Sequence, residues 1–168
     1  MSVSFSGQLA FELHVPNEQL YFIWQLLKSA GEGFNLSQLG LYSTESMRLE
    51  KGYLHWKAEI IDEFNPIEAG LDRFVQFNKS DFVGKQALLK TLAKGCVKKI
   101  VTLQVACEFA LDQGGDPVFH NNKQVGVVSS AGYGHRVNKN SAFAYVDAEL
   151  AQINQSFTVR IIGINCAA

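Results

Sequence analysis

The sequence predicts an α+β fold in which a first half of helices and strands, residues 1–95, is followed by a small all-β, barrel-like domain, residues 96–168. Two observations carry this prediction. Before Gly95, apolar residues recur at the spacing of amphipathic helices. After it, the pattern changes to the two-residue alternation of strands, and no helical pattern of useful length occurs from Lys98 to Ala168. A set of about five or six short strands favours a barrel or a sandwich.

The first element is the stretch SGQLAFELHVP, Ser6–Pro16, which alternates like a half-buried strand. Leu9, Phe11 and Leu13 fall on one side of an extended chain, and Glu12 falls on the other. Glutamate has poor strand propensity. Glu12 therefore either faces water or holds a ligand, and the pattern alone leaves both interpretations open.

Three segments of the first half have helical periodicity: Asn17–Ala30, Ser43–Lys51 and Phe82–Ala93. Asn17 and Asp81 are residue types that cap helices, and we expect them to begin the first and third helices. Gly52 is placed to end the second helix. The apolar run around Phe74–Phe77 favours a short strand.

Strand patterns fill the second half. KKIVTLQVACE predicts one strand, PVFHNNKQVGVVSSAG a hairpin with Asn121 and Asn122 at its tip, and SAFAYV and QSFTVRIIGI one further strand each. The glycine-rich piece SSAGYGHR precedes a strand and not a helix, so it is interpreted as a turn and not as a phosphate-binding loop. The alternative places Tyr133 and His135 at the rim of a pocket.

Composition excludes several classes of function. The net charge is −1 and no basic stripe occurs, so nucleic acid is not an expected partner. No apolar run is long enough to cross a bilayer, so no membrane partner is expected. The three cysteines fit no metal or redox spacing and predict reduced thiols in a cytoplasmic compartment. The four histidines share no metal-ligand spacing, so no metal site is expected.

Three stretches in order resemble the aminomethyltransferase family: SGQLAFELHVP, LYSTESMRLEKGYLHWKAEIIDEFNPIEAGL and DFVGKQAL. That family includes the T-protein of the glycine cleavage system and the folate-dependent C-terminal regions of dimethylglycine and sarcosine dehydrogenases. RLEKGYLHW and GYGH are nearer to the dehydrogenase-linked branch. The resemblance continues through VGVVSSAGYGHRVNKNSAFAYV, so it covers essentially the whole chain.

The resemblance implies tetrahydrofolate-dependent one-carbon transfer, in glycine cleavage or in the degradation of N-methyl amines. In the family, a glutamate on the strand that corresponds to SGQLAFE holds the pteridine ring, and the matching residue here is Glu12. A carboxylate can accept two parallel hydrogen bonds from the ring's amino group and adjacent N–H. Tyr53, Trp56 and Tyr133 would wall the folate pocket. Flavin would belong only to a region upstream of this chain.

The chain also departs from the family pattern. Thr44 stands where the T-protein has a folate-binding arginine, whereas Arg48 matches the second arginine of that motif. We expect Arg48 to form a helix salt bridge with Glu45 at the surface. Lys57 stands where a glycine is common, so the local backbone conformation is in question there.

The resemblance further implies that the chain starts inside the folate domain, without the part that bears the catalytic aspartate. We therefore assign no catalytic residue and expect no catalysis by this chain alone. The alternative function is a non-catalytic folate-binding or structural module. A homodimer, or the missing N-terminal half, would cover the strand edges and apolar surface left exposed.

Overall fold

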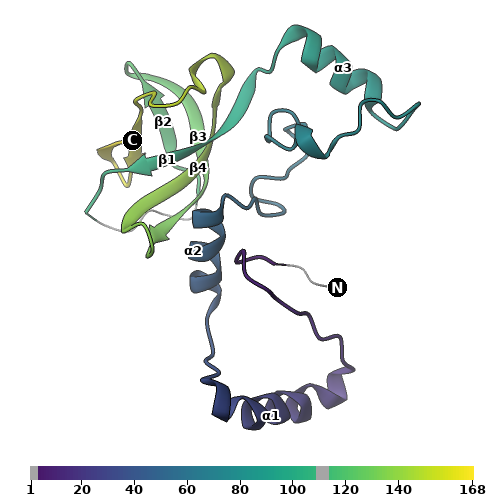
Figure 1. The fold of residues 1–168 in the computed structure, drawn as a ribbon. Helices are drawn as coiled ribbons and strands as arrows, with labels where there is room; N and C mark the ends of the chain where they lie inside the picture. The colour runs from purple at the N-terminus through teal and green to yellow at the C-terminus, as the bar shows by residue number, and fades with distance from the viewer. Residues whose placement is uncertain (1–3, 109–113) are drawn as a thin grey trace.

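The computed structural model describes residues 4–108 and 114–168. Six antiparallel strands form the second half of the chain (Figure 1): β1 Lys98–Val105, β2 Pro117–His120, β3 Lys123–Gly134, β4 Lys139–Asp147, β5 Thr158–Ile161 and β6 Ile164–Ala167. The sheet has the order β1-β4-β3-β2-β5-β6. The prediction of an α+β chain with a barrel-like β half is confirmed.

The two ends of this sheet meet, which makes it a small barrel. The N–H of Ala106, next to β1, donates to the carbonyl of Ala167 in β6 at 2.8 Å. Alternate residues of each strand point inward and form one apolar core, as the two-residue period requires. Its fully buried members include Val118, Ala142, Ala144, Val146, Val159 and Ile161.

Turn chemistry fixes the register of the hairpins. Asn121 and Asn122 have φ of 49° and 64°, the left-handed conformation that a tight two-residue hairpin requires, so the predicted β2–β3 tip is confirmed. QSFTVRIIGI was expected to supply one strand, and that expectation is wrong. Ile162 and Gly163 both have positive φ and separate β5 from β6.

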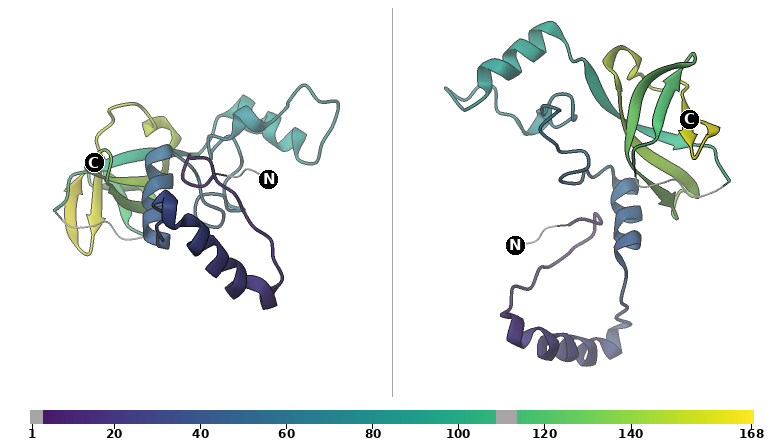
Figure 2. Two further views of the ribbon diagram at one scale, coloured as in Figure 1. Left: turned by 60° about the horizontal axis from the view of Figure 1, so that its bottom comes forward. Right: turned by 180° about the vertical axis from the view of Figure 1, so that it is seen from behind.

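The helices lie in the first half: α1 Leu20–Gly31, α2 Leu41–Lys51 and α3 Lys85–Lys94, with 3-10 turns at Asn17–Gln19, Glu32–Phe34, Asp72–Phe74 and Ala148–Leu150. Of the three α-helices, α2 packs on the barrel, against β3 and β4. Figures 1 and 2 show α1 and α3 standing away from the barrel at the ends of extended connections. Among the helices of the described residues, none combines the length and apolarity that crossing a bilayer requires.

The predicted strand at Ser6–Pro16 is wrong as an element of this structure. The segment runs as an extended, irregular connection (Figure 1) and pairs with no strand of the described chain. A strand needs a neighbour to satisfy its backbone N–H and C=O groups. The alternation of Leu9, Phe11 and Leu13 is present, but no partner strand lies beside it.

Smaller differences concern helix ends. Asn17 and Asp81 do not cap the α-helices: α1 follows a 3-10 turn, and α3 begins at Lys85, after Gly84. The Asp81 carboxylate instead accepts the N–H of Phe82 at 2.9 Å. The expected strand near Phe74 is wrong, because a 3-10 helix occupies Asp72–Phe74. Gly52 ends α2 as predicted, with φ of 73°.

Candidate functional site

A cavity of about 450 Å³ lies between α2, the loop after it and β3. It is lined by Leu41, Tyr42, Glu45, Ser46, Arg48, His55, Ala58, Ser130, Ala131, Gly132, Tyr133 and His135. Its walls combine apolar and aromatic side chains with polar groups from α2, the following loop and β3. A concave site of that composition is typical of small-molecule binding.

Close contact between α2 and β3 builds one wall of this cavity. A Cβ atom at Gly132 would lie 3.0 Å from Leu49 Cδ1, so the glycine lets the helix approach the strand. The Ser46 hydroxyl donates to the carbonyl of Tyr133 at 2.7 Å. One turn further along α2, Glu50 accepts the backbone N–H groups of Arg136 and Val137, at 2.9 and 3.1 Å. These bonds hold the turn after β3 against α2.

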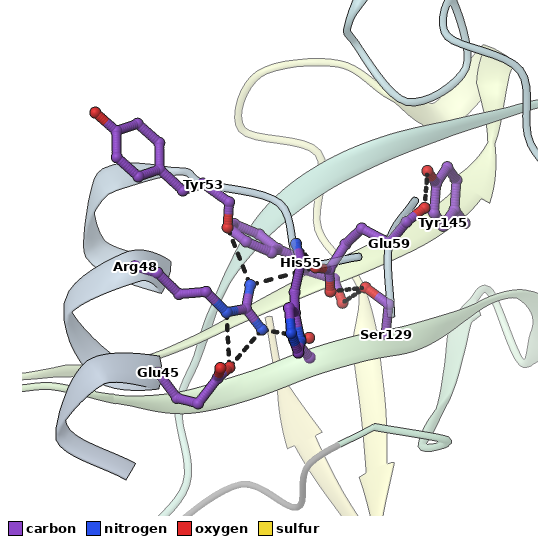
Figure 3. Close-up of polar contacts among 9 residues, drawn as sticks. Glu45, Arg48, Tyr53, His55, Glu59, Ser129 and Tyr145 are labelled. Atoms are coloured by element: carbon purple, nitrogen blue, oxygen red, sulfur yellow. Dashed lines mark hydrogen bonds and ion pairs between the residues drawn. The ribbon is translucent and has the colours of Figure 1, made fainter. Parts of the chain in front are cut away.

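Arg48 lies at the base of the site and is 1% exposed. Its guanidinium donates to Glu45 at 2.6 Å, to the carbonyl of Tyr53 at 3.0 Å, to Glu59 at 3.2 Å and to the hydroxyl of Ser130 at 2.8 Å (Figure 3). The predicted pair with Glu45 is confirmed, but the surface location is wrong. A buried guanidinium needs such partners because an unpaired charge is costly in the interior.

Glu59 is the second buried charge and is 0% exposed. Besides Arg48, its carboxylate accepts the backbone N–H of His55 at 2.7 Å and the hydroxyl of Ser129 at 2.8 Å. Figure 3 shows this carboxylate between the loop after α2 and β3. The acid therefore joins the loop to the barrel.

Tyr145 of β4 completes the cluster. Its hydroxyl donates to the backbone carbonyl of Glu59 at 2.9 Å, and its ring stacks on Phe64 with centroids 3.6 Å apart. Burial, with the nearby negative charges of Glu59 and Glu68, raises the pKa of Tyr145 to about 12. The phenol therefore stays protonated at neutral pH and acts as a donor.

This cluster of buried charges is structural in character. The Arg48 guanidinium and the Glu59 carboxylate are each engaged by several partners from α2, the following loop and β3. A general base needs a lone pair that faces a reacting group, and Glu59 is wholly enclosed. The arrangement can support the cavity and fix its shape. Within the described residues, no group of three or more metal-ligating side chains gathers anywhere.

The sequence-derived site residues are not all brought together. Tyr133 lines the cavity, where its ring meets that of His135 edge to face with centroids 5.1 Å apart. Tyr53 and Trp56 do not line it and are 40% and 65% exposed. Glu12 lies on the extended N-terminal segment, also outside the cavity.

The Glu12 carboxylate is largely exposed to solvent. Its side chain is 61% exposed, and one oxygen lies 3.5 Å from Nε2 of His14. The Glu12 side chain lies outside the cavity described above.

The glycine-rich piece SSAGYGHR was interpreted as a turn, which is wrong for most of its length. Residues 129–134 belong to β3, and the turn follows from His135. A bulge in β3 between Val128 and Ser130 interrupts the regular alternation of side chains along the strand. The alternative, in which Tyr133 and His135 lie at a pocket rim, agrees with the structure.

Sequence reasoning missed the roles of His55, Glu59, Ser129 and Ser130. A buried glutamate looks like a solvated one in a segment where charges and aromatics alternate, as they do from Tyr53 to Phe64. Ser129 and Ser130 lie 70 and 82 residues from their partners, so no local pattern links them. The one available signal was the pair of adjacent serines in an otherwise apolar strand.

Lys57 has a left-handed backbone conformation. Its φ is 71°, in the left-handed region that glycine adopts freely and other residues avoid. Its N–H donates to the carbonyl of Ile60 at 3.1 Å, which closes the short loop that contains Glu59. Glycine would adopt this conformation freely, whereas the lysine holds it with strain.

Comparisons with known proteins match both halves of the chain. A model described as the GCVT N-terminal domain matches residues 1–79, and a model described as the glycine cleavage T-protein C-terminal barrel domain matches residues 98–168. The matched order is the order expected from the sequence motifs.

Several relatives match nearly the whole chain. Human mitochondrial dimethylglycine dehydrogenase is 35% identical over 167 residues, which is 99% of this chain and 19% of that protein. The aminomethyltransferase of Caldanaerobacter subterraneus is 31% identical over 157 residues, 94% of this chain and 42% of that protein. Mouse mitochondrial sarcosine dehydrogenase is 34% identical over 86% of this chain and 16% of its own length.

One solved structure supports the same grouping. The crystal structure of glycine cleavage system aminomethyltransferase T from Bartonella henselae superposes with a TM-score of 0.79 at 25% identity, over 88% of this chain and 42% of that one. The chain therefore spans less than half the length of each of these relatives.

Proposed function

Because the chain belongs to the aminomethyltransferase family of glycine cleavage T-proteins, we propose that it is the folate-contacting and barrel-bearing part of a larger one-carbon transfer protein. The observation that carries the proposal is the pair of successive matches: residues 1–79 match the GCVT N-terminal domain model, and residues 98–168 match the C-terminal barrel model. Tetrahydrofolate accepts the one-carbon unit in this proposal. The donor is the aminomethyl group of glycine cleavage or an oxidised N-methyl amine, since relatives of both kinds match.

In this proposal, Glu12 binds the pteridine through its two carboxylate oxygens, and Tyr53, Trp56 and Tyr133 contribute aromatic surface to the folate site. The exposed carboxylate of Glu12 and the aromatic rim formed by Tyr133 and His135 support these roles. Any flavin would be held by other regions of a dehydrogenase-type parent. A cytoplasmic location remains a prediction from the cysteines, while the dehydrogenase relatives are mitochondrial by name.

A second candidate is a folate-binding or structural module without catalysis of its own. The observation that favours it is that both acids near the cavity already have partners within the chain. Glu59 is fully buried, and Glu45 accepts a hydrogen bond from Arg48 at 2.6 Å. The Glu59 carboxylate is closed off from solvent, and the Glu45 carboxylate is neutralised by its ion pair with Arg48. The two candidates share folate binding and differ in whether this chain alone turns over substrate.

Calorimetric titration with 5-formyltetrahydrofolate, a stable reduced folate, tests the shared part. We expect the wild-type chain to bind and Glu12→Gln to bind about tenfold or more weakly, because a charge-assisted hydrogen-bond partner contributes about 1.5–3 kcal/mol. Glu18→Gln, which neutralises a neighbouring glutamate in the 3-10 turn before α1, is the matched control and should bind like wild type.

Two results would contradict the proposal. If wild type and Glu12→Gln bind the folate equally well, the pteridine role of Glu12 is wrong. If neither the chain nor its complex with a family N-terminal part binds any reduced folate, the folate function itself is wrong. Turnover of an aminomethyl or N-methyl donor by the chain alone would exclude the non-catalytic candidate.

A further inference from the structure

Two cysteines lie opposite each other where the barrel closes. The bridge that joins the two ends of the sheet pairs Ala106, directly after β1, with Ala167 of β6 in antiparallel register. In such a register the next residue of one strand faces the preceding residue of the other, so Cys107 lies opposite Cys166. Both alanines are exposed, and side chains alternate across a strand, so both cysteine side chains point toward the barrel interior.

The burial of the two thiols agrees with this placement. Cys166 is 5% exposed and belongs to the apolar core of the barrel, while Cys107 is half-buried and packs against the same core. Burial raises the pKa of the Cys166 thiol, and the adjacent Cys107 thiol and a hydrogen bond between the two raise that pKa further. The two sulfur atoms are therefore neighbours in the folded chain.

The side chain of Asn140 holds Cys107 in place. Its Nδ2 donates to the carbonyl and to the Sγ of Cys107, at 3.1 Å each. Asn140 is itself 8% exposed and lies in β4, which pairs with β1. One buried amide thus fixes both the backbone and the sulfur of Cys107 at the edge of the barrel.

The spacing of a directly opposed pair is close to that of a disulfide. Such residues have Cβ atoms about 4.5–5.5 Å apart, and a disulfide joins Cβ atoms about 3.5–4.5 Å apart. A small approach of β6 to the end of β1 is therefore sufficient. In the described chain these two edges meet through the single bridge at Ala106, so β6 can shift without breaking a ladder of hydrogen bonds.

We propose that Cys107 and Cys166 are a redox-sensitive pair, which a peroxide oxidises to a disulfide that links the two edges of the barrel covalently. Cys107 reacts first, because its sulfur is the more accessible to solvent. Its thiolate attacks one oxygen of hydrogen peroxide, which forms a sulfenic acid and releases hydroxide. The Cys166 sulfur then attacks the sulfenic sulfur, and its proton leaves with the displaced hydroxyl group as water. The two thiols lose two electrons and two protons in total, and the peroxide is reduced to two molecules of water.

The third cysteine, Cys96, distinguishes this pairing from chance oxidation. It is nearer than Cys166 to Cys107 in the sequence, and an unfolded chain closes the shorter loop more readily. In the folded chain β1 separates Cys96 from Cys107, and its eight residues span about 26 Å at about 3.3 Å per residue. Oxidation therefore favours Cys96–Cys107 in the unfolded chain and Cys107–Cys166 in the folded chain.

The test oxidises the chain with hydrogen peroxide, blocks the remaining thiols with iodoacetamide and maps the linked peptides by mass spectrometry, once under native conditions and once in concentrated urea. Under native conditions we expect the Cys107–Cys166 link to exceed both links of Cys96 about tenfold or more. In urea, Cys96–Cys107 should predominate. Cys96→Ala is the matched control and should keep the native link, whereas Cys107→Ala and Cys166→Ala should abolish it.

The link should also change stability, because it closes a long loop in the unfolded chain. We expect the oxidised wild type to unfold at a midpoint about 5–10 °C above that of the reduced protein, and dithiothreitol to reverse the shift. Thermal denaturation followed by circular dichroism measures it. Cys96→Ala should show the same shift, and Cys107→Ala should show none.

Four results would overturn the proposal. They are full alkylation of both thiols after peroxide treatment, recovery of Cys107 only as sulfinic or sulfonic acid with Cys166 free, the same linkage pattern in native conditions as in urea, and links that join separate chains. The wild-type peptide map distinguishes all of these outcomes. The test therefore does not depend on the folding of Cys166→Ala, which alters a core position.

Discussion

Replacing Arg48 by methionine tests whether the buried cluster holds α2 to the barrel. The side chain is 1% exposed and donates hydrogen bonds to Glu45, Tyr53, Glu59 and Ser130. Methionine fills much of the same volume but supplies no positive charge. The Glu59 carboxylate would then remain buried with only the His55 N–H and the Ser129 hydroxyl as donors.

Removing one partner of a buried ion pair costs about 3–5 kcal/mol. Because Glu59 keeps two neutral donors, we expect a loss near the lower end, about 3 kcal/mol in the free energy of unfolding. Urea denaturation followed by circular dichroism measures it. Arg160→Met is the matched control. Arg160 is exposed, and its guanidinium donates a hydrogen bond to the side chain of Asn165 at 3.1 Å. Its replacement should cost less than about 1 kcal/mol.

A double-mutant cycle with Glu59→Gln isolates the pair. The double variant should lose about 1–2 kcal/mol less than the sum of the single losses, since the two side chains are in contact. A loss below about 1 kcal/mol for Arg48→Met, or strict additivity in the cycle, would refute the reasoning that this ion pair stabilises the fold.

Two further predictions concern the loop and the barrel. Lys57→Gly should raise the free energy of unfolding by about 1 kcal/mol, because it removes the left-handed strain at φ 71°, whereas Lys57→Ala should bring no gain; thermal denaturation compares them. Tyr145 has its pKa raised to about 12 in the folded chain, so its stabilising effect is complete below its unfolded pKa of about 10 and is lost as the pH rises towards 12. Alkaline absorbance titration of wild type against Tyr145→Phe measures this shift, and a Tyr145 phenolate that forms near pH 10 in the folded protein would contradict it.

The β half could be predicted because its signals are local. Asn121 and Asn122 determine a hairpin through their own backbone preferences, and strand alternation survives in a barrel with one inner and one outer face. The same reasoning failed at Ile162, where a β-branched residue with φ of 48° gives no turn signal in the sequence. The family motifs are also local signals: each is a contiguous stretch, so the relatives could be identified from the sequence alone.

The remainder depended on contacts that no local pattern contains. The segment around Phe11 has the alternation of a strand, yet a strand exists only where a neighbour accepts its hydrogen bonds. In the sequence, Glu59 is indistinguishable from a surface residue, because its partners Ser129 and Arg48 meet it only in the folded chain. Glu12 was selected by resemblance alone, and its role remains a prediction.

The residues of the buried cluster are far apart in the sequence, so the cluster can form only late during synthesis of the chain. The Arg48 guanidinium and the Glu59 backbone carbonyl find partners 82 and 86 residues further along the chain, in β3 and β4. A ribosome adds about 5–20 residues per second, so these groups spend seconds in water before their partners emerge. The loop after α2 therefore stays solvated until most of the barrel has been synthesised, and chaperones that bind nascent chains would meet the exposed α1 well before that point.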